Sequence, residues 1–203
     1  MSMSNTLDTL RKAGFFKELS CSSNDEILDK IYKQRRKFYS KVFGDDYDPG
    51  RDLNDQELAR QDTKKMFYLD LEAGVLPENK VYVCLLKALD EISGRENLIT
   101  EIDEEWKGEN GPIIISCRIN GEPRQFNPEY CNDWIDQKLI DHILSEISDL
   151  TQEQFHLCLG PNLEWFGQDV NYMRLTWDER KILEESLSWS FFDDFIKESK
   201  SEP

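Results

Sequence analysis

The sequence predicts an α+β fold: a mostly helical N-terminal part, followed by a small antiparallel sheet with helices packed on one face. Three observations lead to this prediction. Apolar residues recur at helical spacing through most of the first 95 residues. An Asn-Gly pair joins two segments of alternating polarity within residues 113–126. The second half then follows the order strand, strand, helix, strand, strand, helix, and such hairpin connections favour an antiparallel sheet.

The N-terminal third predicts two helices. Residues 5–19 form a short one interrupted at Gly14. Ser23 and Glu26 have the spacing of a capping box for a longer helix that ends before Gly44. Apolar residues recur in it at positions 27, 28, 31, 32, 38, 39, 42 and 43, and its outer face carries Lys30, Lys33, Arg35, Arg36, Lys37 and Lys41.

The middle of the chain is also expected to be helical. A loop rich in Gly, Asp and Pro at residues 44–55 is the candidate boundary between subregions, and helical signals resume over 56–74. Residues 81–93 are apolar nearly all round, which is typical of a helix at the centre of a core. In the acidic segment 95–111, helical spacing is kept by Leu98, Ile99, Ile102 and Trp106.

A hairpin is predicted next, because Asn120-Gly121 suits a two-residue turn. The turn fixes the register, and Pro123 then lies at a position where its missing N–H costs the hairpin nothing. The second strand is therefore expected at a sheet edge. The register pairs Ile119 with Glu122, Arg118 with Pro123, Cys117 with Arg124 and Ile115 with Phe126.

The remaining elements complete the predicted sheet. Asn132 or Asp133 is expected to cap a helix whose buried face runs from Trp134 to Ile147. Strands follow at 155–159 and 172–175, with a weak strand or loop at 163–170, and a capping box starts the last helix at Thr176. We expect residues 1–95 and 96–198 to form two subregions packed as one unit, followed by a disordered tail at 199–203.

Composition restricts the classes of partner. The 203 residues carry a net charge of -16, which disfavours nucleic acid and anionic membranes because charges of the same sign repel. The acidity is uneven: residues 96–153 hold four basic and 14 acidic residues. No apolar run approaches the roughly 18 to 20 residues that span a bilayer, and the N-terminus lacks the apolar core of a signal peptide. An odd number of cysteines, five, suits buried free thiols in a reducing cytosol, so a cytoplasmic protein is expected.

The sequence contains no CxxC pair, no HExxH motif and no calcium-binding loop. The nearest arrangement to a metal site is His156 and Cys158 on one strand face, with His142 and Cys131 before them, and we interpret these residues as packing. No GxSxG motif is present, and we interpret a Cys/His pair such as Cys131 with His142 or His156 as packing and not as a nucleophile with its base. We therefore predict no catalytic, cofactor or metal residues. A hydrolase using loop carboxylates near Glu164 and Asp169, with Trp165 as a stacking platform, stays an alternative.

Two charged segments are candidate binding surfaces. The basic helix 27–43 could contact phosphates, but the repulsive overall field favours a solvated face or one docked on acidic surface of this chain or a second copy. A dense negative surface with aromatics is what a protein uses to hold a basic partner. Plain solubility explains the same acidity, so both interpretations stay open. The acidic set is Asp103, Glu104, Glu105, Trp106, Glu109, Glu129, Tyr130, Asp133 and Trp134.

Over roughly residues 68–187, the hairpin, the NDWID segment and the strand with its capped helix in LTWDERKILEE resemble proteins of the toxin-immunity type. Such proteins are acidic, cytosolic and inhibitory, and bind a basic nuclease toxin at or beside its active site. The resemblance implies a partner surface at Glu104, Glu105, Trp106, Asp133, Trp134 and Asp136.

The leading prediction is therefore a non-enzymatic acidic binding or inhibitor protein, of which an immunity protein neutralising a basic toxin is the specific form. Besides the hydrolase, a further alternative is a structural or regulatory module. It would self-associate through the aromatic tail Trp189, Phe191, Phe192 and Phe195.

Overall fold

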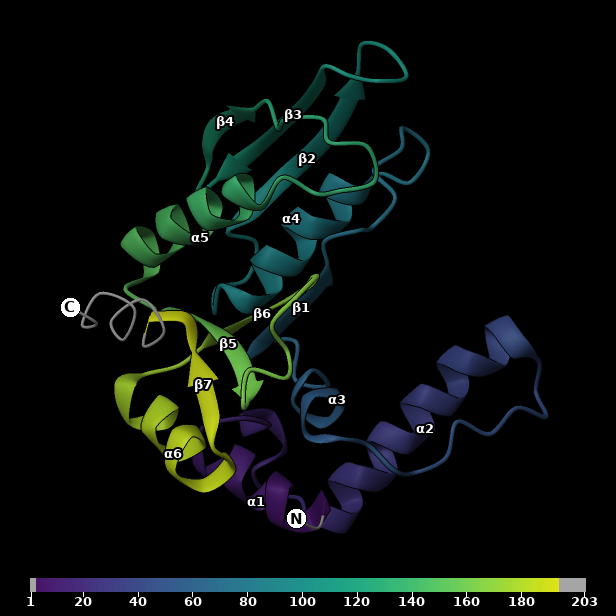
Figure 1. Ribbon diagram of the computed structural model, residues 1–203, viewed down its shortest axis with the longest axis vertical. Helices are drawn as coiled ribbons and strands as arrows, with labels where there is room; N and C mark the ends of the chain where they lie inside the picture. Colours follow the sequence, from purple (N-terminus) through teal and green to yellow (C-terminus); the bar gives the residue numbers. More distant parts are fainter. Residues whose placement is uncertain (1–2, 194–203) are drawn as a thin grey trace.

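A computed structural model describes residues 3–193, and within them the predicted α+β fold is confirmed (Figure 1). No helix in this range is long and apolar enough to cross a membrane. The helices are α1 (Met3–Lys12), the short 3-10 helix η1 (Lys17–Leu19), α2 (Asn24–Phe43), α3 (Asp55–Ala59), α4 (Val81–Ile92), α5 (Gln137–Thr151) and α6 (Trp177–Leu187). The strands are β1 (Met66–Asp70), β2 (Ile99–Trp106), β3 (Ile113–Ile119), β4 (Glu122–Phe126), β5 (Phe155–Pro161), β6 (Asp169–Arg174) and β7 (Trp189–Phe191).

The strands divide between two antiparallel sheets, where the sequence predicted one. One sheet has the order β1-β6-β5-β7 and the other the order β2-β3-β4. Figure 1 shows the three-stranded sheet with α4 and α5 in the upper half, and α1, α3, α6 and β7 in the lower half. The strands β1, β6 and β5 lie between the two halves.

Two hydrophobic cores meet at the β1–β6 pair. Phe67 and Tyr172 are paired neighbours that belong to the upper core with α4 and α5. Met66 and Met173, the adjacent pair, belong to the lower core with α1 and α6. Both cores draw on residues from either side of residue 95, so packing joins the two predicted subregions. The predicted disordered tail, 199–203, lies outside the described residues.

The predicted hairpin is confirmed in its register. Ile119 pairs with Glu122, Cys117 with Arg124, and β4 lies at the edge of its sheet. Both turn residues have the positive φ that this turn requires, 52° at Asn120 and 81° at Gly121. The inward side chains of β3 share the upper core with α4 and α5, so these helices cover one face of the sheet.

The helix predicted over residues 95–111 was wrong, because the centre of this segment, Ile99–Trp106, forms the strand β2. The pairing of β2 with β3 shifts register between Thr100 and Asp103, where Glu101 has a φ of 51°. A bulge of this kind inserts extra residues and breaks the two-residue alternation of a strand. Because of the bulge, the side chains of Ile99 and Ile102 both pack against the upper core although they are three residues apart. The same spacing is typical of a helix, which explains the wrong prediction.

The helical prediction for residues 56–74 was also wrong for most of its length. Only α3 is helical, and β1 follows as a strand paired with β6. Met66 and Phe67 point into different cores, so both faces of β1 are apolar there. A strand buried on both faces lacks the alternation that would have identified it.

Helix starts were predicted with mixed success. The capping boxes at Ser23 and Thr176 are both present. The cap predicted at Asn132 or Asp133 was wrong: Asp136 accepts the backbone N–H of Lys138, and α5 begins at Gln137. The preceding segment is held elsewhere, since the N–H of Ile135 donates to the Leu71 carbonyl at 2.8 Å.

The outer half of α2 projects from the body (Figure 1), which its sequence spacing did not predict. Ile27 and Ile31 are its buried residues. The apolar positions further along are exposed, with Phe38 at 63%, Val42 at 64% and Phe43 at 61%. The apolar periodicity of α2 thus continues beyond Ile31, although the rest of the protein no longer covers the helix there.

All five cysteines are free thiols, as predicted, but only two are buried. Cys117 and Cys158 lie in the cores, while Cys21, Cys84 and Cys131 are exposed. Burial raises the pKa of the Cys117 thiol to about 11.

Candidate functional site

Glu104 is turned into the fold by β2 and is only 2% exposed. Its Oε2 accepts the backbone N–H groups of Tyr82 at 3.0 Å and Val83 at 3.2 Å, in the first turn of α4. Its Oε1 accepts the indole N–H of Trp106 at 2.8 Å. A carboxylate at a helix N-terminus satisfies donors that have no partner within the helix. The side chain of Glu104 therefore holds α4 on β2 and is not available at the surface.

The segment 129–136 meets the end of β2 at the same place. The ring of Trp106 packs edge-on against Tyr130, with centroids 5.7 Å apart. The backbone N–H of Asp136 donates to the Tyr82 hydroxyl at 3.2 Å. The two groups of candidate residues predicted from sequence, 103–106 and 133–136, are therefore brought together around the N-terminus of α4.

We call the exposed carboxylates around this junction the acidic rim. Asp103 and Glu105 stand on the outer face of β2, opposite to Glu104, as the alternation of a strand requires. Trp134 is 42% exposed, and its backbone forms an isolated antiparallel β-bridge with that of Glu72. The acidic rim consists of Glu72, Asp103, Glu105, Glu109, Glu129 and Asp133.

Lys80 and Lys107 lie beside the acidic rim, and both are engaged. Lys80 donates to the Glu104 backbone carbonyl at 2.5 Å, and Lys107 pairs with Glu105 at 2.5 Å. The other carboxylates of the rim outnumber them. Asp136 is half-buried and serves as the α5 cap, while Trp106 is half-buried against Tyr130. Of the predicted contacts, Asp103, Glu105, Asp133 and Trp134 are exposed.

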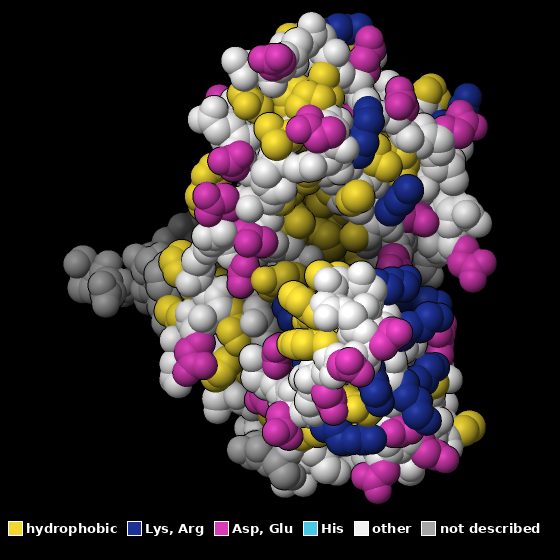
Figure 2. Space-filling model, turned by 90° about the vertical axis from the view of Figure 1, so that its right-hand side faces the viewer, with side chains coloured by type: hydrophobic (Ala, Val, Ile, Leu, Met, Phe, Trp, Pro, Cys, Tyr) yellow, Lys and Arg dark blue, Asp and Glu magenta, His cyan; other side chains and the backbone are white. Residues whose placement is uncertain are grey.

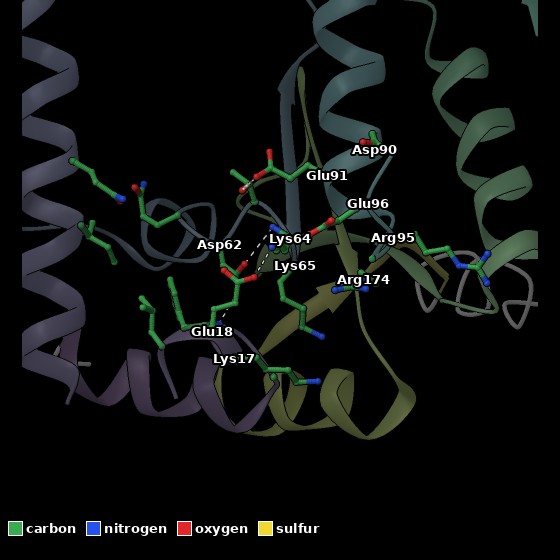
Figure 3. A pocket seen from close by; sticks show the side chains of 18 of the residues that line it. Lys17, Glu18, Asp62, Lys64, Lys65, Asp90, Glu91, Arg95, Glu96 and Arg174 are labelled. Atoms are coloured by element: carbon green, nitrogen blue, oxygen red, sulfur yellow. Dashed lines mark hydrogen bonds and ion pairs between the residues drawn. The ribbon is translucent and has the colours of Figure 1, made fainter. Parts of the chain in front are cut away.

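A cleft of about 770 Å³ lies on another part of the molecule, between the lower half and the C-terminal end of α4 (Figure 3). Lys64 and Lys65 reach it from the turn before β1, and Arg174 from the end of β6. The lining of this cleft combines charges of both signs. The charged lining residues are Lys17, Glu18, Lys30, Asp62, Lys64, Lys65, Asp90, Glu91, Arg95, Glu96 and Arg174.

Four cations of the cleft are already paired. Lys65, 6% exposed, donates to Glu179 at 2.9 Å, and Lys17 shares that carboxylate at 3.5 Å. Burial lowers the pKa of Lys65, and the ion pair with Glu179 opposes this. Lys64 pairs with Glu18, and Arg174 lies 3.4 Å from Glu153.

Asp62 supports the wall of this cleft. Its carboxylate accepts the backbone N–H of Phe16 at 2.5 Å and that of Lys64 at 3.2 Å. Burial raises the pKa of Asp62. Phe16 has a φ of 56°, which is unfavourable for an aromatic residue, and its bond to Asp62 fixes this conformation. The paired groups of the cleft thus join the segment 16–18, the turn before β1 and the start of α6 to one another.

The carboxylates of the hydrolase alternative lie elsewhere. Neither Glu164 nor Asp169 lines the cleft, and Asp169 begins β6 while Arg174 ends it. Asp169 accepts the Tyr68 hydroxyl at 3.2 Å. The indole of Trp165 packs against Trp189 at 4.7 Å, so it is used in the core.

The histidines and cysteines considered for metal binding are dispersed. His156 and Cys158 are buried, whereas His142 and Cys131 are exposed. Across residues 3–193, no group of three or more His, Cys, Asp and Glu side chains is placed to hold a metal ion.

The aromatic tail proposed for self-association is partly in the core. Trp189 and Phe191 are 2% and 1% exposed and lie in β7, which pairs with β5. Phe192 is half-buried, and Phe195 lies outside the described residues. The buried pair cannot offer a surface to another molecule without unfolding β7.

Sequence reasoning missed the cleft entirely. Lys65 directly precedes β1, Arg174 is the last residue of β6, and Glu179 is the third helical residue of a capping box. The only available signal was a lysine pair directly before a strand, which was assigned to a helix. Their meeting depends on the pairing of β1 with β6.

No protein-family model, no curated protein and no solved structure matches this sequence. The likeness to toxin-immunity proteins therefore stays a prediction from sequence.

Proposed function

We propose that this chain is a non-enzymatic acidic binding protein of the inhibitor class, which holds a basic protein partner at the acidic rim. An immunity protein that neutralises a basic toxin is the specific form of this proposal. The supporting observation is that two acidic, aromatic segments, 103–106 and 129–136, meet around the N-terminus of α4. The exposed carboxylates of the acidic rim surround the partly exposed indole of Trp134. This arrangement suits a partner with a basic surface and an apolar centre.

The other charged region supports this choice by contrast. The six cations that line the cleft are matched by five lining carboxylates together with Glu153 and Glu179, so little net positive charge is left to attract a partner. At the acidic rim, by comparison, the two neighbouring lysines are already engaged and most carboxylates face solvent. Long-range attraction of a basic protein is therefore strongest at the rim.

The test begins with capture of basic proteins from the native host on the immobilised chain, at low and at high salt. A captured protein is then purified and its affinity measured by calorimetry. We expect binding that weakens with salt, and a loss of about tenfold or more in affinity for the double variant Asp103→Lys/Asp133→Lys. Glu104→Lys is unsuitable, because this side chain is buried in the fold.

A matched control separates local contact from overall charge. Asp149→Lys/Glu185→Lys changes the net charge equally at two exposed positions on α5 and α6. We expect this control to lose less than about threefold in affinity. If both double variants bind as the unchanged protein does, or weaken equally, the rim is not the binding site.

A further inference from the structure

The strand β1 is the outermost strand of the four-stranded sheet, and Figure 1 shows no further strand beyond it. Just before β1, the N–H of Arg174 donates to the Lys65 carbonyl at 3.0 Å. Just after it, the N–H of Leu71 donates to the Gln168 carbonyl at 3.1 Å. In an antiparallel pair, such bonded positions alternate with positions whose backbone groups point away from the partner strand. Because the register is unbroken, the odd-numbered positions of β1 bond to β6 and the even-numbered positions face the free edge.

Met66, Tyr68 and Asp70 therefore direct their backbone N–H and C=O groups to this free edge. The N–H of Met66 is used, because it donates to the Asp62 carbonyl at 2.9 Å. No described residue hydrogen-bonds to the backbone groups of Tyr68 or Asp70, and both residues are half-buried. Figure 2 looks at the molecule from the side of this edge and shows hydrophobic side chains in a hollow between the upper and lower halves. The free edge thus offers donors and acceptors to another strand.

Within the described residues, the other sheet edges are protected against such pairing. The edge strand β4 contains Pro123, which has no N–H to donate. The strand β2 is interrupted by its bulge between Thr100 and Asp103, and the Lys80 side chain donates to the Glu104 carbonyl. The remaining edge strand, β7, has only three residues. By contrast, β1 keeps one register over its whole length and contains neither proline nor lysine.

The acidic end of this edge indicates the charge of the strand that fits it. Asp70 lies directly opposite Asp169, at a non-hydrogen-bonded position where side chains on one face approach most closely. Like charges opposite each other destabilise a sheet. The Gln168 amide donates to Asp70 at 2.6 Å, and the Tyr68 hydroxyl donates to Asp169 at 3.2 Å, so both donors are neutral. In the described part of the chain neither aspartate pairs with a lysine or an arginine. A basic side chain on an added strand would therefore relieve their repulsion.

We propose that β1 accepts an antiparallel strand from the basic protein partner, with a lysine or arginine directly opposite Asp70. That residue lies on the same face of the sheet as Asp70 and Asp169, because residues that pair across strands share a face. The next residue of the added strand falls on the other face, beside the half-buried Leu69, and is apolar. Glu72 of the acidic rim follows β1 closely, so the added strand leads into the rim. The inference rests on the proposed function for the charge of the partner, but not for the position of the site.

Amide hydrogen exchange of the full chain, followed by NMR, tests the edge itself. The N–H groups of Tyr68 and Asp70 should exchange at least about tenfold faster than those of Phe67 and Leu69, which bond to β6. The binding probe is an acetylated and amidated heptapeptide of alternating valine and lysine. We expect it to shift the Tyr68 and Asp70 amide signals and to slow their exchange. The same peptide with glutamate in place of lysine should bind at least about tenfold more weakly.

Backbone methylation of the peptide separates strand pairing from charge. The residue opposite Asp70 turns its own backbone groups towards β1, because Asp70 faces the free edge. N-methylation of the lysines should therefore block binding, although the charge is unchanged. N-methylation of the valines alters only the outer edge of the peptide and should leave binding as it was.

Variants of the chain provide the matching test. Asp70→Pro removes the edge N–H while every bond between β1 and β6 stays in place, and it should abolish peptide binding. Asp70→Asn keeps that N–H and removes the charge, and it should weaken binding about three- to tenfold. Far-UV circular dichroism shows whether each variant is folded. The rim variant Asp103→Lys/Asp133→Lys should weaken the peptide no more than Asp149→Lys/Glu185→Lys does.

Three results would overturn the proposal. One is the absence of any change at Tyr68 and Asp70 at millimolar peptide. Another is equal binding by the peptide methylated at its lysines. The third is a set of shifts confined to Asp133 and Trp134, which would leave the acidic rim as the site and remove the strand site. Peptide binding at β1 together with a captured partner that ignores the rim variants would instead refute the rim and keep the edge.

Discussion

At the scale of single residues, Glu104 and Glu105 show how a strand gives neighbouring carboxylates opposite roles. Glu104 receives three hydrogen bonds inside the fold, and Glu105 is exposed beside Lys107. We expect Glu104→Gln to lower the free energy of unfolding by about 1–3 kcal/mol, because an amide cannot accept with both of its ends. Urea unfolding measures this loss. Glu105→Gln is the control and should change stability by less than about 0.5 kcal/mol; equal losses would contradict the assigned role.

His156 predicts how stability depends on pH. Burial, together with Arg180 at 3.2 Å, lowers the pKa of His156, while Asp193 at 3.8 Å opposes this. The unfolded chain therefore binds a proton at a higher pH than the folded chain does. The free energy of unfolding should fall as pH drops through the unfolded value of 6.5 towards the folded one.

The two histidines of the chain provide the comparison. Urea unfolding between pH 7.5 and 5.5 should give a positive slope of stability with pH, and His156→Gln should remove most of it. His142→Gln should keep the slope, because that side chain is exposed on α5. A slope that survives His156→Gln would assign the effect to another group.

At the scale of elements, two glycines allow the energetic cost of a positive φ to be distinguished from the cost of a steric clash. Gly14 and Gly121 have the same φ of +81°. A Cβ at Gly121 would meet nothing within 4 Å, but one at Gly14 would lie 2.0 Å from Oε1 of Glu179. That carboxylate is held by Lys65 and by the Thr176 N–H, so it cannot move freely.

We therefore expect different losses from the same substitution. Gly121→Ala should cost about 1 kcal/mol through its backbone alone. Gly14→Ala should cost about 1–3 kcal/mol more, because the methyl group displaces Glu179 from Lys65. Chemical denaturation of the two variants under one condition gives the comparison. Equal losses would mean that Glu179 can leave its position without cost.

The elements that sequence predicted well are those fixed by local chemistry. Asn120-Gly121 sets the register of β3 and β4, and Ser23 with Glu26 starts α2. The strand β2 was missed because its bulge exists only through pairing with β3. For the same reason the sequence could identify the segments 103–106 and 133–136 as acidic, but it could not predict that they lie side by side. That meeting passes through Tyr82, which lies in a helix that neither segment adjoins in sequence.

At the scale of the whole molecule, the β1–β6 pair couples the upper and lower cores. Phe67 and Tyr172 fill one face, and Met66 and Met173 fill the other. If either core opened, it would expose one face of β1 and β6, and the opposite face of the same two strands is part of the other core. Shared strands of this kind favour unfolding as a single unit.

Calorimetry and urea unfolding test this coupling. We expect one thermal transition, with circular dichroism and tryptophan fluorescence reporting the same midpoint. Met173→Ala in the lower core and Leu86→Ala in the upper core, both at fully buried positions, should each cost about 2–5 kcal/mol. Each should move the whole transition to lower temperature. If the cores were independent, each variant would shift one of two separate transitions and leave the other in place. That result would mean that β1 and β6 can release one core while still covering the other, and the division would then follow the two faces of this strand pair, not residue 95.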